Sequence, residues 1–189
     1  MTILSSKTVV TIVCPFLCLI GCNKKLVAPG PPINACTLLE SDEVEGVQGS
    51  SVTESKSSVN ANRGLRVAQC YYAAKESSKS VVLTVTQRNA EHSGTPAVTS
   101  VWDEMFGNEA GEKKEREHEH EEGEEVAAPT RISDVGDEAY WTGARFGGAL
   151  YVLKKDKDVF MRISVGGADT KEIKIEKSKA LARKAYDRL

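Results

Sequence analysis

The stretch GLRVAQCYYAAKESSKSVVLTVTQR, residues 64–88, decides the fold. Both of its halves are rich in Val, Thr and Tyr, which are enriched in β-strands. Along residues 80–88 apolar positions alternate with positions that include threonines, as in a strand with one buried face. The five polar residues 75–79 between the halves form a short turn. The stretch therefore predicts an antiparallel hairpin of two strands, 64–74 and 80–88.

Beyond this hairpin, the C-terminal half predicts three further strands and a closing helix. The strands are expected at residues 139–146, 150–154 and 159–165, with the turn Lys-Asp-Lys-Asp between the last two. The closing helix is expected to begin near Asp169 and to run to about Arg188.

Two more helices are predicted on either side of the hairpin. Thr37 and Glu40 have the spacing of a capping box, which places the first helix at residues 37–48. The second helix is expected to begin at Thr95-Pro96 and to continue to residue 106, because Trp102 and its apolar neighbours recur at helical spacing. We interpret this apolar stripe as a packing face; the alternative is that it lines a hydrophobic cleft.

Together these elements predict an α+β fold in one domain, residues 35–189. The sheet is expected to be largely antiparallel with about five strands, flanked by helices as an α/β/α sandwich. A chain of 189 residues with 40% hydrophobic residues is long enough for one such core.

The N-terminus has the pattern of an export signal. The apolar run of residues 8–20 follows Lys7 and would make about 20 Å of helix, which is short of the roughly 30 Å hydrocarbon core of a bilayer. Such a run is typical of a secretory signal. The alternatives are an uncleaved signal anchor and an ordinary signal followed by a chance cysteine.

The run ends in Leu19-Ile20-Gly21-Cys22, which resembles the lipobox of bacterial lipoproteins. The resemblance implies that the Cys22 thiol receives a diacylglyceryl group, that cleavage follows Gly21, and that the new amine is acylated. Residues 1–21 would then be the signal peptide, and residues 22–34 a lipidated cysteine with a flexible, Pro-containing tether. The expected partner of Cys22 is the lipid bilayer, and the expected location is the cell envelope.

Cysteine usage predicts one disulfide bond. Cys14 and Cys18 would leave with the signal peptide, and Cys22 would carry lipid. Cys36 and Cys70 remain in an oxidising compartment, where two cysteines permit a single pairing. The alternative is a pair of buried free thiols.

A charged segment, residues 109–125, interrupts the second half of the domain. It contains nine glutamates and no large apolar residue, so we expect a solvated loop or a frayed helix. His118 and His120 flank a glutamate within it and offer ligands for Zn²⁺, Ni²⁺ or Cu²⁺. Our main interpretation is a solvated charge run, and metal binding is the alternative.

Several short motifs resemble those of small bacterial envelope lipoproteins of unknown function that are thought to adopt a PsbP-like α/β/α sandwich. They are ACTLLE (35–40), AQCYY (68–72), VGDEAYW (135–141), LYVL (150–153) and ALARKA (180–185). The resemblance implies the same sandwich and a Cys36–Cys70 bridge. It supplies no catalytic or ligand-binding residues.

The sequence favours a binding or interaction module over an enzyme. A formal charge of −2 argues against a nucleic-acid partner, and the usual motifs for nucleotides, catalytic zinc or redox dithiols are missing, so we expect no cofactor. We therefore expect a non-enzymatic envelope module that presents a sheet edge, or a cleft beside Trp102 and Trp141. The alternative is a metal-buffering lipoprotein that uses His118 and His120.

Overall fold

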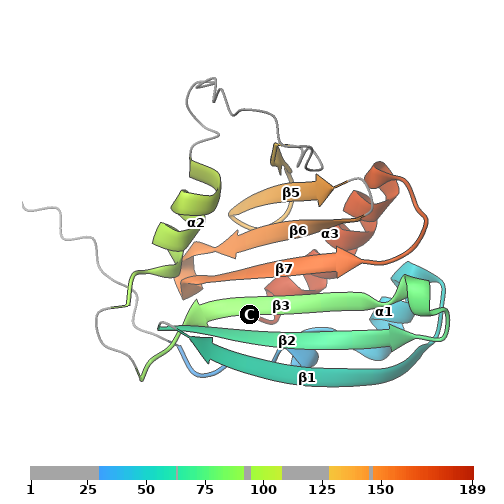
Figure 1. Ribbon diagram of the computed structural model, residues 1–189, viewed down its shortest axis with the longest axis horizontal. Coiled ribbons are helices and arrows are strands. Elements are labelled where there is room, and N and C mark those ends of the chain that lie inside the picture. The colour runs from blue at the N-terminus through green and yellow to red at the C-terminus, as the bar shows by residue number, and fades with distance from the viewer. Residues whose placement is uncertain (1–29, 63, 92–94, 108–127, 145–146) are drawn as a thin grey trace, which may run out of the picture.

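The computed structural model describes residues 30–62, 64–91, 95–107, 128–144 and 147–189 (Figure 1). The predicted signal peptide, Cys22 and the segment 109–125 lie outside these residues. Within them, seven strands form one sheet in the order β1-β2-β3-β7-β6-β5-β4, and every neighbouring pair is antiparallel. The strands are β1 (Val52–Asn62), β2 (Leu65–Ala74), β3 (Val81–Arg88), β4 (Thr130–Arg131), β5 (Glu138–Ala144), β6 (Gly147–Lys154) and β7 (Val159–Val165). The helices are α1 (Ser41–Gln48), α2 (Val98–Phe106) and α3 (Lys171–Asp187).

The α+β class, the antiparallel sheet and the β2–β3 hairpin are confirmed, whereas the expected strand number is wrong. The described sheet has seven strands rather than about five, because β1 and β4 were not predicted. β1 is almost entirely polar and exposed, so it lacks the apolar alternation that marks a half-buried strand. β4 has two residues, which is too short to leave a pattern.

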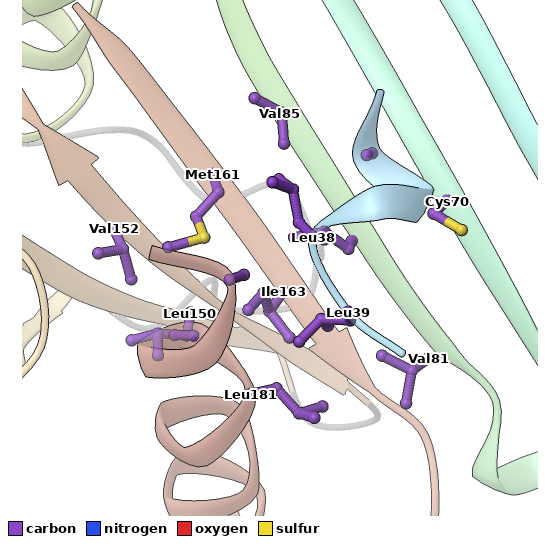
Figure 2. Packing of buried hydrophobic residues seen from close by; sticks show 14 of the residues in the cluster. Leu38, Leu39, Cys70, Val81, Val85, Leu150, Val152, Met161, Ile163 and Leu181 are labelled. Carbon is purple, nitrogen blue, oxygen red and sulfur yellow. The ribbon is translucent and has the colours of Figure 1, made fainter. Parts of the chain in front are cut away.

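The main core fills the space between one face of the sheet and α1 and α3. Met161 and Ile163 of β7 and Leu150 of β6 point into it, opposite Leu181 of α3 (Figure 2). Leu38 and Leu39 enter the same core from the segment before α1. Figure 1 shows α1 and α3 behind the sheet.

The second helix, α2, packs on the opposite face of the sheet. Phe160 and Met161 are neighbours on β7 and therefore point to opposite faces. Met161 joins the main core, while Phe160 joins a second cluster with Trp102 and Phe106 of α2. Helices thus lie on both faces, although α2 covers only one end of its face.

The N-terminal part of the domain is fixed to the sheet by a disulfide and by one side chain. Cys36, in the 3₁₀ turn Ala35–Thr37, is bonded to Cys70 of β2, with Cα atoms 4.9 Å apart. The predicted disulfide is confirmed. The Gln87 amide accepts from the backbone N–H of Ile33 (2.8 Å) and donates to the Pro31 carbonyl (3.1 Å). The end of the predicted tether is therefore hydrogen-bonded to β3.

Two helix starts differ from the prediction. Thr37 lies in the 3₁₀ turn, and α1 begins at Ser41, where Glu40 and Glu43 form the capping box. α2 begins at Val98 rather than at Thr95-Pro96, and Ala97 at its N-cap provides no capping side chain. The backbone N–H of Thr99 is instead bound by Asp158, which is distant in the sequence.

Candidate interaction surface

On the face of the sheet that carries α2, a row of polar and aromatic side chains runs from β1 to Tyr151 of β6, which packs against Phe106 of α2. Strand register places them side by side across five strands: Ser58, Gln69, Thr84, Arg162 and Tyr151. Ser58 is exposed and the other four are half-buried. We call these five residues the polar row. Hydroxyl, amide and guanidinium groups in one line offer hydrogen bonds to a partner laid across the sheet.

Arg162 is the charged group of the polar row, and its position is fixed by Tyr151. Its Nε donates a hydrogen bond to the Tyr151 hydroxyl (3.1 Å), and its guanidinium lies 5.8 Å from the centre of the Tyr151 ring. The Arg162 and Tyr151 contacts hold a planar donor group ready for a carboxylate or another acceptor without using all of its N–H groups.

One edge of the sheet is long and open. β2 pairs with β1 along ten register positions, and among the described strands none lies on the other side of β1. Residues 53–61 are all exposed, so neither α2 on one face of the sheet nor α1 and α3 on the other covers this strand. The backbone groups along such an edge are available for pairing with another strand. At the opposite edge, the sheet ends in the two-residue strand β4.

The expected cleft beside Trp102 and Trp141 is not formed. Trp102 is 1% exposed and belongs to the cluster under α2, whereas Trp141 is 3% exposed and belongs to the main core on the other face. The two indoles lie on opposite sides of the sheet, so no single cleft is lined by both. The apolar stripe of α2 is a packing face, as the main interpretation predicted.

The acidic pair Asp137-Glu138 has local structural contacts. The Glu138 carboxylate accepts from Nε1 of Trp102 (3.0 Å) and pairs with the Lys155 ammonium. The pairing with Lys155 is the main reason why the pKa of Glu138 is lowered, and the hydrogen bond from Trp102 lowers it further. Asp137 accepts from the backbone N–H of Lys155 (2.7 Å). Both carboxylates therefore take part in contacts that join neighbouring elements of the fold.

A small pocket and a buried ion pair lie beside the first described residues of the chain, which begin at Gly30. The pocket has a volume of about 320 Å³ and is lined by apolar residues such as Pro31 and Ile33 and by Lys157. Arg88 and Asp158 also line it, and Arg88 Nε lies 2.7 Å from Asp158 Oδ2. The contact is close enough for an ion pair but is not aligned as a hydrogen bond. Sequence reasoning missed this pair because its members are 70 residues apart and match no motif.

The remaining predicted site residues are outside the structure's described part. Cys22, His118 and His120 all fall there. Across the described ranges, no cluster of three or more His, Cys, Asp or Glu side chains is placed to hold a metal ion. No helix among the described residues is both long and apolar enough to span a membrane.

Comparison with protein-family models, with curated proteins and with solved structures gives no match for this chain.

Proposed function

We propose that this chain is a membrane-anchored bacterial lipoprotein whose α+β domain is a non-enzymatic binding or interaction module of the cell envelope. The observation that carries the proposal is the Cys36–Cys70 disulfide. Structural disulfides persist in oxidising compartments outside the cytoplasm. An exported domain agrees with the apolar run 8–20 and with the lipobox-like sequence that ends at Cys22.

The described surface supports binding more than catalysis. The polar row is spread across five strands, so its groups lie in a line across the sheet and do not converge on one reacting atom. The titratable pairs in the described domain, such as Glu138–Lys155 and Arg88–Asp158, join neighbouring elements. A polar sheet face beside an open strand edge suits a macromolecular partner.

The anchor is tested by detergent partitioning of the full chain expressed in a bacterium that processes lipoproteins. Wild-type protein should enter the detergent phase and should incorporate a labelled fatty acid. Cys22→Ser should do neither, because the acyl acceptor is lost. Cys18→Ser is the matched control, since it removes a cysteine from the same region and should behave as wild type. Equal partitioning of wild type and Cys22→Ser would disprove the anchor.

The binding role is tested separately by native mass spectrometry of the protein released from isolated envelopes under mild conditions. A retained protein or small molecule that is lost in Arg162→Ala would support binding through the polar row. Bound metal that disappears in the His118→Ala/His120→Ala variant would favour the metal-buffering alternative instead.

A further inference from the structure

We propose that the open edge of β1 pairs with β1 of a second copy of this chain, in antiparallel register about Ser58, so that two seven-stranded sheets join into one. The inference rests on the edge itself and holds whether or not Cys22 carries lipid.

The edge of β1 carries few of the devices that usually prevent strand pairing. Natural edge strands carry lysines, prolines, bulges or inward charges, or they are very short. β1 has eleven residues and no proline, and its irregularity lies at its start, between Val52 and Glu54. Its one lysine, Lys56, is 2.9 Å from the Glu54 carboxylate, so the charges largely cancel. From Ser57 to Asn62 the strand is uncharged.

The regular part of β1 is complementary to a second copy of itself. The regular part of β1 runs from Glu54 to Asn62, and Ser58 is its centre. A two-fold axis at Ser58 gives the longest overlap of this part with itself, with Lys56 opposite Asn60 and Glu54 opposite Asn62 of the second copy. No like charges face each other in this register, and every opposed pair contains a small or polar side chain.

An exposed apolar side chain, Val59, lies next to the axis at Ser58. Val59 is 48% exposed, on the face toward α1 and α3. In the register about Ser58, Val59 lies opposite Ser57 of the second copy and diagonally beside the second Val59. Pairing would therefore cover one of the few large hydrophobic side chains that the described surface exposes.

The edge strand is held rigidly, and its pairing is complete with two copies. Ser57 lies opposite Cys70 on β2, and the disulfide fixes Cys70 to the segment before α1, so the strand behind the edge is already ordered. An ordered edge loses less conformational entropy on pairing. Because the other edge ends in the short strand β4, the contact is isologous and closes at two copies.

Cysteine crosslinking of the full chain under mild oxidation tests both the contact and its register. Ser58→Cys should form a disulfide-linked dimer, because directly opposed residues have Cβ atoms about 5 Å apart. Lys56→Cys is the matched control on the same strand and face. Its two copies would lie about 14 Å apart and should crosslink at least tenfold more slowly. A mixture of Lys56→Cys and Asn60→Cys chains should again crosslink rapidly, and the unaltered chain gives the background from native cysteines.

A charge at the axis provides an independent test by sedimentation. Val59→Lys should raise the dimer dissociation constant at least tenfold, because two ammonium groups would meet at the axis. The monomer should remain folded, since Val59 is already half-exposed. Three results would overturn the proposal: a wild-type monomer throughout the micromolar range, equal crosslinking of Ser58→Cys and Lys56→Cys, or capture of a different protein at position 58.

Discussion

The Asp158 carboxylate lies 2.7 Å from Nε of Arg88, where the end of β3 meets the turn before β7. Both side chains are largely buried, at 5% and 10% exposure. The other Asp158 oxygen accepts from the backbone N–H of Thr99 at 3.3 Å. One buried carboxylate therefore links the sheet to the first turn of α2, and negative charge is favourable at that end of a helix.

Asp158→Asn should destabilise the domain by about 3 kcal/mol, because it leaves the Arg88 guanidinium buried without a counter-charge. Asparagine tolerates the left-handed backbone at this position, where φ is 52°. The loss of stability therefore reports the removed charge and not backbone strain. Urea unfolding measures the effect. The double variant Arg88→Met/Asp158→Asn should regain part of the stability. A double variant less stable than Asp158→Asn would contradict this account.

Removing the disulfide should lower the free energy of unfolding by about 3–4 kcal/mol, because it closes a loop of sequence separation 34. The Cys36→Ala/Cys70→Ala variant should unfold at lower urea, and reductant should have no further effect on it. Wild type should shift toward the variant when reduced. Identical wild-type curves with and without reductant would contradict the prediction.

Acid should destabilise the contact between α1 and α3. Arg188 at the end of α3 donates two hydrogen bonds to Glu43 (2.6 and 2.9 Å), and this pairing lowers the pKa of Glu43 from 4.5 to about 2. A lowered pKa in the folded state contributes stability that is complete above pH 4.5 and is lost as the pH falls toward 2. Because the Arg188 side chain is exposed to solvent, which screens the pair, we expect a contribution to stability of at most about 1 kcal/mol.

Glu43→Gln should therefore be less stable than wild type at pH 7, and the difference should shrink between pH 4.5 and 2. Unfolding measured across this range, with Glu45→Gln as the control, tests the sign. Glu45 lies on the same helix and has no ion pair among the described contacts. A difference that stays constant or grows on acidification would refute the role of the pair.

Gly148→Ala should destabilise the sheet by about 1–3 kcal/mol through overpacking. A Cβ atom at Gly148 would lie 2.1 Å from Cζ2 of Trp141, whose indole occupies that space. Gly147→Ala is the matched control on the adjacent residue, because nothing lies within 4 Å of a Cβ built there. Thermal unfolding should separate the two variants. Equal melting temperatures would show that Trp141 can move aside.

The sequence predicts the elements that are buried on one face and misses those that are not. β7 is predicted at its observed bounds, because alternate residues such as Met161 and Ile163 are apolar. β1 carries no such signal, since it exists through backbone pairing with β2 and both of its faces are exposed. The sequence analysis expected an exposed sheet edge, but the side-chain pattern could not show that β1 forms it.

The predicted start of α2 is wrong for a related reason. Thr95-Pro96 has the local signature of a helix start, but the carboxylate that binds the first turn comes from Asp158, on the other side of the predicted acidic segment. Short-range rules cannot include a cap supplied by tertiary structure. By contrast, the Cys36–Cys70 pairing could be predicted without knowledge of the fold, because the predicted export and lipidation left only these two of the five cysteines.

The most direct test of the proposed anchor is the mass of the N-terminal peptide of the mature protein purified from membranes. We predict that the first residue is Cys22, with a diacylglyceryl group on its sulfur and an acyl group on its amine. A mature chain that retains residues 1–21, or that begins at an unmodified cysteine, would contradict the account.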